Sequence, residues 1–171
     1  HGLNFIHDGV EMKQQILDLA LDYLAIGIDP KKSLIYKQSD LPEHAELCWI
    51  FDAITPMAYL ERSHAYKDAV ANDREINVGT FNYPMLMAAD ILLYDIDVVP
   101  VGQDQKQHVE FARDTAQKFN HVFKKEGFKL PTEKIIQSVA IVPGTDGRKM
   151  SKSYGNTIPL FAEDDEIEKT V

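Results

Sequence analysis

Two short apolar runs rich in β-branched residues, 97–101 and 139–142, constrain the fold of this chain most strongly. The first run ends at Gly102, and a long segment with apolar residues at helical spacing, 104–122, follows it. Such runs predict buried strands, and a helix between two strands predicts a right-handed crossover that makes the strands parallel. We therefore expect an α/β protein with a doubly wound parallel sheet, whose ligands bind beyond the carboxyl ends of the strands.

Helical periodicity and helix-end residues predict the remaining elements. An apolar face and a stop at Gly27 predict a helix over 10–26. The same arguments predict helices over 42–54, 55–67 and 81–94, and a final helix in the acidic tail from Glu163. A strand is expected at 33–37, and loops at 72–78 and 130–132. Core positions are expected for Trp49 and Phe51, and surface positions for the histidines without metal-ligand spacing: His7, His44, His64 and His121.

Composition limits the class of function. The 171 residues suffice for one domain with its own core, and no stretch approaches the roughly 20 apolar residues of a membrane span. The net charge of −9 argues against a protein that mainly coats nucleic acid. Cys48 is the single cysteine, so a disulfide framework is excluded and a cytoplasmic location is expected. The chain starts without Met or a basic leader, so we expect a fragment of a longer protein rather than a signal peptide.

The loop 144–156 combines two lysines, two serines and three glycines. Lys149 and Lys152 are three residues apart, and Ser151 and Ser153 alternate with them. Two ammonium groups with hydroxyls suit a polyphosphate whose charge grows during a reaction, and glycines allow close approach of the backbone. Lysines alone are more often a solvated basic loop. The whole string Lys-Met-Ser-Lys-Ser after a predicted strand favours phosphate chemistry.

The predicted helix over 81–94 carries a carboxylate in an apolar segment. Tyr83, Met87 and Asp90 are spaced at i, i+4 and i+7, so they share one face. A buried carboxylate is costly unless it is hydrogen-bonded or paired. Asp90 is equally compatible with a structural bond to backbone or Arg and with an acceptor that faces a ligand.

The turn after the first predicted strand is a third candidate. Gly102, Gln103, Asp104 and Gln105 stand between the strand and the following helix. A helix N-terminus favours anions, and Asp is a preferred capping residue there. Taken alone, Asp104 is more simply explained as a cap.

Together these three blocks resemble the class I aminoacyl-tRNA synthetases, and their tryptophanyl branch in particular. The resemblance covers about residues 22–159 and implies part of a Rossmann-like doubly wound parallel sheet with a helical connecting region at 42–78. In that family the lysine loop closes over ATP, and its lysines, here Lys149 and Lys152, stabilise the leaving pyrophosphate. The ATP-binding positions it implies are Gly102, Gln103, Asp104, Val142, Lys149, Met150, Ser151, Lys152 and Ser153.

The same resemblance implies a tryptophan site. In the family the Asp matching Asp90 accepts the indole N–H, and the Met matching Met87 packs on the ring, where tyrosyl enzymes carry Gln. The substrate-binding positions implied are Tyr83, Met87, Asp90, Val99, Val101 and Gln105. His108 is expected to be structural or to act through a neighbour, and His1 matches a family His near the tryptophan carboxylate. Arg62 and Lys67 fall where the family has dimer contacts, although a solvated face is equally expected.

The implied activity is activation of L-tryptophan with ATP and its transfer to tRNA(Trp), with Mg²⁺ accompanying ATP, by a cytoplasmic homodimer without a membrane partner. Two departures matter. The first class I signature, a Gly- and His-containing loop, and the helical anticodon domain are both absent, so residues 1–171 match only part of a catalytic domain and are expected to be inactive alone. A tyrosyl-type synthetase and a non-catalytic nucleotide-binding module remain as alternatives.

Overall fold

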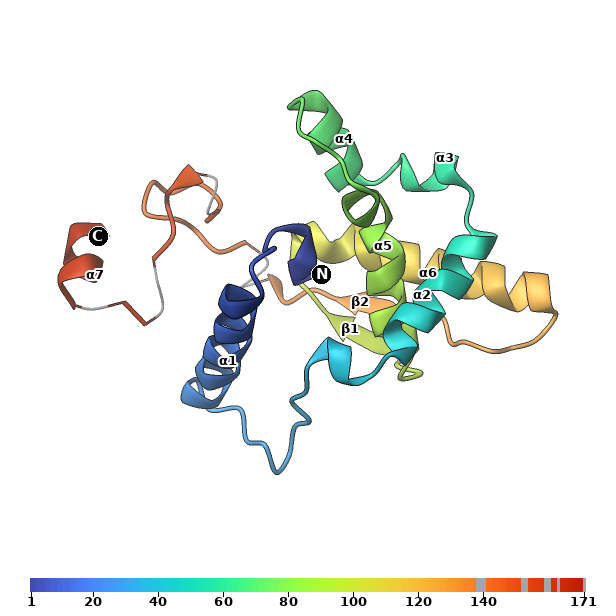
Figure 1. Cartoon of the computed structure of the whole chain (residues 1–171), viewed down its shortest axis with the longest axis horizontal. Helices are drawn as coiled ribbons and strands as arrows, with labels where there is room; N and C mark the ends of the chain where they lie inside the picture. Colours follow the sequence, from blue (N-terminus) through green and yellow to red (C-terminus); the bar gives the residue numbers. More distant parts are fainter. Residues whose placement is uncertain (138–140, 152–153, 159–160, 163, 171) are drawn as a thin grey trace.

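The computed structural model describes residues 1–137, 141–151, 154–158, 161–162 and 164–170. Within them the α-helices are α1 Gly9–Ala25, α2 Glu43–Ile54, α3 Met57–Leu60, α4 His64–Ala71, α5 Val78–Leu92, α6 Lys106–Phe123 and α7 Asp164–Thr170. The strands are β1 Val98–Pro100 and β2 Thr132–Lys134. Three 3₁₀ turns are η1 Gly2–Asn4, η2 Gln38–Asp40 and η3 Gln103–Gln105. Figure 1 shows α5 near the centre, with α7 and the C-terminus far to one side.

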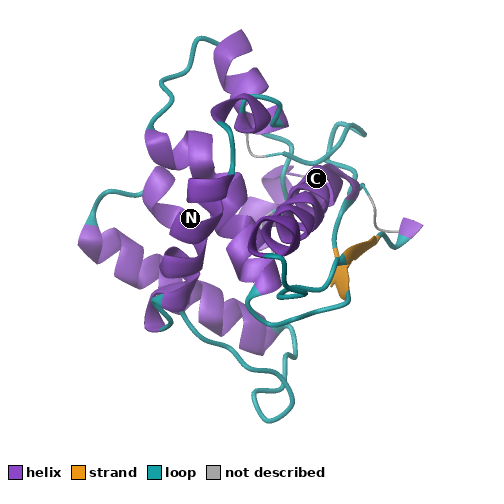
Figure 2. Cartoon of the chain, turned by 90° about the vertical axis from the view of Figure 1, so that its right-hand side faces the viewer, coloured by secondary structure: helices purple, strands orange, loops and turns teal. Residues whose placement is uncertain are grey.

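The described sheet has two parallel strands that α6 connects. Val99 of β1 is in register with Glu133 of β2. Arg113 of α6 holds β2 against the helix. Its guanidinium group donates hydrogen bonds to Glu133 Oε2 and to the carbonyl oxygen of Pro131, both at 2.9 Å. Figure 2 shows both strands to one side of the helices. The predicted parallel pairing around a crossover helix is therefore confirmed.

Several strand predictions were wrong in detail. The partner of β1 is β2, whose first residue, Thr132, was predicted to be loop. The run Thr-Glu-Lys is polar, so no apolar pattern marks it as a strand. The predicted strand at 139–142 falls partly outside the described residues, and Ile141 and Val142 are not in a strand. Residues 34–37 are irregular rather than a strand, and Leu34 is 82% exposed. Val98 is also largely exposed, so β1 is not fully buried.

The core lies where α5 packs between α2 and α6. α5 buries a face of small and large apolar residues, and its alanines let the neighbouring helices approach closely. α6 buries one stripe at helical spacing. The central members of the core are Phe51, Met85, Ala88, Ala89, Leu92, Phe111, Ala112 and Ala116. Phe51 is in the core as predicted, whereas Trp49 is 74% exposed because residues two apart point to opposite sides of a helix.

Two helix boundaries follow from capping side chains. The helix predicted over 55–67 is broken, because Ser63 Oγ accepts the Tyr66 N–H and starts α4. The loop expected at 72–78 ends early, because Asn77 Oδ1 accepts the Thr80 N–H and starts α5 at Val78. The first long helix differs from the other long helices in burial, because α1 has no buried residue. No helix among the described residues has the length and apolarity needed to cross a membrane.

Candidate active site

Asp90, near the C-terminal end of α5, is the centre of a polar cluster. Gln38 Nε2 donates to both of its oxygens, at 2.7 and 2.9 Å. His1 Nε2 lies 2.9 Å from Oδ2, and His44 Nδ1 lies 2.6 Å from Oδ1. These neighbours come from residues 1, 38 and 44, and η2 at the end of the irregular segment 34–37 positions Gln38. The Asp90 side chain is 29% exposed, so it remains open to a ligand.

His44 is buried at 3% exposure, so the prediction that it lies at the surface was wrong. Its Nε2 contacts the hydroxyl groups of Tyr36 at 3.1 Å and Tyr94 at 3.2 Å, and these two hydroxyl groups bond each other. The bond with Tyr94, together with burial, raises the pKa of Tyr36 to about 12, so this phenol is protonated at neutral pH. Sequence spacing carries no sign of this cluster because its members lie 8 to 58 residues apart. His7, His64 and His121 are exposed, as predicted.

Tyr83 lies on the same side of α5 as Asp90. The His1 ring meets the Tyr83 ring edge-on at 6.0 Å between centroids while His1 also bonds Asp90. Tyr83 Oη is hydrogen-bonded to His108 Nε2, and their ring centroids are 5.0 Å apart. Burial raises the pKa of Tyr83 and lowers that of His108, so both groups are neutral near pH 7. Met87 is partly buried against the core on the same helix.

The turn 102–105 follows the carboxyl end of β1. Gly102 precedes η3, and Gln105 is the N-cap of α6 without a side-chain cap bond, so Asp104 does not cap a helix. Asp104 Oδ2 instead accepts from Gln105 Nε2 at 3.2 Å and lies 3.2 Å from Lys149 Nζ. Partial burial raises the pKa of Asp104, but the bonds from Gln105 and Lys149 and the lysine charge outweigh it, so the net shift is downward.

The loop 142–156 folds back on itself. Pro143 and Lys149 form an antiparallel bridge, and the Met150 N–H donates to the Val142 carbonyl oxygen at 2.8 Å. Gly147 and Gly155 have φ of 76° and 64°, in the left-handed region that favours glycine. The loop thereby presents Lys149 to the turn 102–105.

Asn156 holds this loop together, and sequence reasoning did not single it out. It is 2% exposed, its Nδ2 donates to Asp146 Oδ1 at 2.7 Å and to the Lys149 carbonyl oxygen at 3.1 Å, and its Oδ1 accepts the Ser151 N–H at 2.7 Å. A Cβ at Gly144 would overlap the Asn156 side chain. A polar residue after a glycine in a glycine-rich loop was the only available signal.

The other predicted site residues differ in how exposed they are. Val99 packs against the core, and Val101, Gly102, Gln105, Met150 and Ser151 are partly buried. Gln103 and Asp104 are exposed, and Val142 is 54% exposed. Lys152 and Ser153 lie outside the described residues. Arg62 and Lys67 line a polar depression between α3, α4 and α6.

The fold, together with the helix that carries Asp90, the turn 102–105 and the loop 142–156, can be compared with known families. The sequence family described as tRNA synthetases class I (W and Y) matches residues 7–171, and the chain belongs to that family. Within it, the chain is 53% identical over 171 residues to the tryptophan–tRNA ligase of Fusobacterium nucleatum, matching 100% of this chain and 53% of that protein. The chain thus spans about half the length of the curated relatives it matches.

Solved structures agree in fold. A tryptophanyl-tRNA synthetase from Campylobacter jejuni, complexed with ADP and tryptophan, matches with a TM-score of 0.90 at 50% identity, over 99% of this chain and 53% of that one. The synthetase from Mycoplasma pneumoniae matches with a TM-score of 0.89 at 33% identity, over 99% of this chain and 52% of that one. The chain therefore has the Rossmann-like α/β fold of the class I tryptophanyl enzymes, with a small parallel sheet and many helices.

Proposed function

We propose that the natural protein carrying this sequence is a tryptophan–tRNA ligase, which activates L-tryptophan with ATP to tryptophanyl-adenylate and transfers it to tRNA(Trp). The names of the relatives support this, and so does the Campylobacter structure, which holds ADP and tryptophan. The observation that carries the proposal is the Asp90 carboxylate, held by Gln38 beside Tyr83 and still partly exposed.

Tryptophan would bind with its indole N–H on Asp90. Asp90 Oδ2 has contacts with Gln38 and His1. The His1 side chain is 37% exposed. An indole N–H can replace the His1 donor without leaving the carboxylate unpaired. Met87, Val99 and Val101 would line the ring, with Tyr83 beside it, and Gln105 would meet the polar end of the amino acid. A partly buried acceptor of this kind disfavours substrates that lack the donor, because Oδ2 then loses a hydrogen bond that the indole would supply.

ATP would bind across the turn 102–105 and the loop 142–156. Its adenosine side would face Gly102, Gln103 and Asp104, with Val142, Met150, Ser151 and Ser153 from the loop. The Lys149–Asp104 pair is about half exposed, so it is weak and easily exchanged. Lys149 can then leave Asp104 for the phosphates, where it would act with Lys152.

In the reaction, the tryptophan carboxylate attacks the α-phosphorus and pyrophosphate leaves. No protein nucleophile is required. The two lysines would stabilise the charge that develops on the leaving group, and the fixed Asp90 would orient the amino acid.

Mg²⁺ would enter with ATP and neutralise phosphate charge. In the part of the chain that the structure describes, no group of three or more His, Cys, Asp or Glu residues is arranged to hold a metal ion. The ATP phosphates and water would therefore supply most of its ligands.

The proposal also includes assembly and location. We propose a cytoplasmic homodimer. Arg62 and Lys67 are placed near the contact between the two subunits, because both side chains line an open depression that also includes Asp114. The isolated 171-residue chain is proposed to be inactive, since it matches about half of its relatives.

Tryptophan-dependent ATP–pyrophosphate exchange, followed by charging of tRNA(Trp), tests the proposal. We expect exchange by the natural protein and none by the isolated chain. Exchange driven by tyrosine instead would establish the tyrosyl alternative. Calorimetry that detects ATP binding, with no exchange driven by tryptophan or tyrosine, would favour the non-catalytic nucleotide-binding module.

A further inference from the structure

His44 stands between the candidate substrate acceptor and two phenols. One ring nitrogen, Nδ1, lies 2.6 Å from Asp90 Oδ1, and the other, Nε2, lies 3.1 and 3.2 Å from the hydroxyl groups of Tyr36 and Tyr94. The Tyr36 ring also stacks on the His44 ring, with centroids 6.0 Å apart. The proposed reaction uses none of these three aromatic residues directly.

The contacts of this cluster indicate which nitrogen of His44 carries the proton. A bare Nδ1 would direct its lone pair at a carboxylate oxygen 2.6 Å away, which is repulsive, so Nδ1 carries a proton although its alignment with Asp90 is imperfect. One phenol proton is used in the bond between Tyr36 and Tyr94. His44 Nε2 is within reach of both hydroxyl groups and can accept the other phenol proton. A ring with its proton on Nδ1 directs that N–H toward Asp90 Oδ1 and offers Nε2 as an acceptor to the two phenols.

The two oxygens of Asp90 consequently have different neighbours. Oδ1 faces Gln38 and the buried His44, whereas Oδ2 faces Gln38 and the more exposed His1. A carboxylate fixed on one oxygen cannot rotate freely, so the other oxygen is presented in one direction.

We propose that His44, oriented by Tyr36 and Tyr94, is a positioning residue that holds Asp90 by Oδ1 and leaves Oδ2 as the acceptor for a ring N–H of the substrate. His44 thereby helps to set the preference for a ring that carries an N–H donor. This inference rests on the proposed tryptophan site.

Two amide substitutions at His44 separate positioning from packing. The amide nitrogen of Asn takes the place of Nδ1, so His44→Asn keeps a donor for Asp90, whereas the amide of Gln reaches toward the tyrosines, so His44→Gln loses that donor. The measurement is kcat/KM in ATP–pyrophosphate exchange by the natural protein, for tryptophan and for an analogue in which sulfur replaces the indole N–H. We expect His44→Gln to lower the preference for tryptophan about tenfold or more, the scale of one hydrogen bond to a charged group, and His44→Asn to retain most of it. Equal effects of the two variants, or no effect of either, would overturn the inference.

A measurement without catalysis tests the same cluster if both variants misfold. The ¹⁵N resonances of the histidine rings in the natural protein, at neutral pH, report which nitrogen is protonated. We expect a protonated Nδ1 and a bare Nε2 for His44, assigned from the signal that shifts in Tyr94→Phe. A bare Nδ1, or protons on both nitrogens, would refute the arrangement. Absence of tryptophan-dependent exchange in the wild type would count against the proposed function, while the ¹⁵N result would still decide the state of His44.

Discussion

At the scale of single residues, the two halves of the site use charge differently. Asp90 is surrounded by donors that keep it in place, and its side chain is 29% exposed. Lys149 forms a weak ion pair with Asp104, and about half of its side chain is exposed. The proposed amino-acid side is therefore preorganised, whereas the proposed phosphate side would be free to rearrange on ATP binding.

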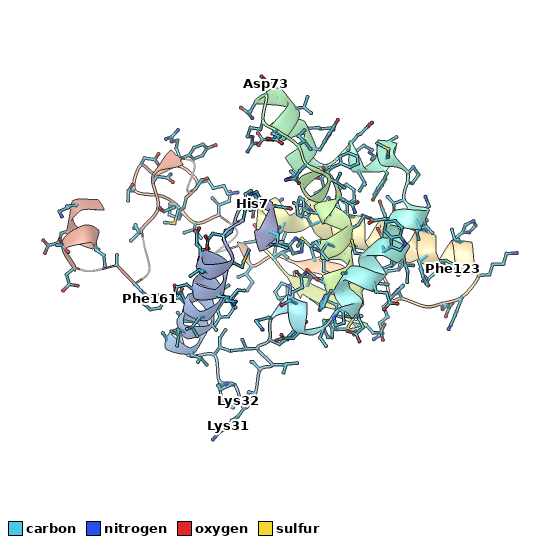
Figure 3. All side chains as sticks on the ribbon, viewed as in Figure 1. His7, Lys31, Lys32, Asp73, Phe123 and Phe161 are labelled. Carbon is cyan, nitrogen blue, oxygen red and sulfur yellow. The ribbon has the colours of Figure 1, made fainter. Side chains whose placement is uncertain are left out.

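Replacement of the loop lysines tests this division. We expect Lys149→Ala and Lys152→Ala to lower kcat for pyrophosphate exchange by roughly 10²-fold or more. Each substitution removes a positive charge that would stabilise the negative leaving group. The dissociation constant of tryptophan, measured by calorimetry, should change little, since both lysines are assigned to the phosphates and Lys149 lies beside Asp104. Lys31→Ala is the control, because Lys31 points away from the body of the molecule at the tip of the connection after α1 (Figure 3). Equal losses in kcat for all three variants would contradict the assignment.

At the scale of elements, the loop 142–156 depends on a close approach between Gly144 and Asn156. Gly144→Ala would place a methyl group on the Asn156 amide. We expect the amides of Met150 and Ser151 to exchange with solvent about tenfold faster in this variant, because both bonds belong to the same folded loop. Gly9→Ala, where nothing lies within 4 Å of the added carbon, is the matched control and should leave these rates unchanged. Unchanged exchange in Gly144→Ala would show that the loop does not need this contact.

The same loop predicts a pH dependence. Hydrogen bonds from Asn156 and then Arg148 lower the pKa of Asp146 from 3.8 to about 2. A lowered acid pKa stabilises the folded loop fully above pH 3.8, and the effect is lost as the pH falls through about 2. Asn156→Ala removes the largest cause, so the Asp146 titration midpoint, followed by ¹³C NMR of its carboxyl group, should rise toward 3.8. Arg148→Ala removes a side-chain hydrogen bond and a positive charge, so it should raise the midpoint too, and an unchanged midpoint in both variants would contradict the assignment.

At the scale of the whole molecule, stability is expected to differ between helices. α5 buries six residues, whereas α1 buries none and exposes Leu17, Leu21 and Leu24. Hydrogen exchange of the 171-residue chain should therefore protect the amides of α5 much more strongly than those of α1. Equal protection of the two helices would show that α1 has a partner surface in the isolated chain.

The sequence predicted what periodicity and motifs can encode. The shared face of Tyr83 and Asp90, the parallel pairing around α6 and the family all followed from local patterns. The polar strand β2 and the Ser63 break did not, because tertiary bonds and a single capping hydroxyl decide them. His44 and Gln38 were missed as partners of Asp90, since a contact across about 50 residues leaves no trace in spacing.

The most direct test of tryptophan recognition is the ratio of kcat/KM for tryptophan to that for tyrosine in pyrophosphate exchange by the natural protein. With wild-type Asp90 we expect this ratio to be at least about 10², and Asp90→Asn, which keeps the shape but replaces an acceptor oxygen by a donor, should lower it about tenfold or more. An unchanged ratio in Asp90→Asn would contradict the role of Asp90 as the acceptor of the indole N–H.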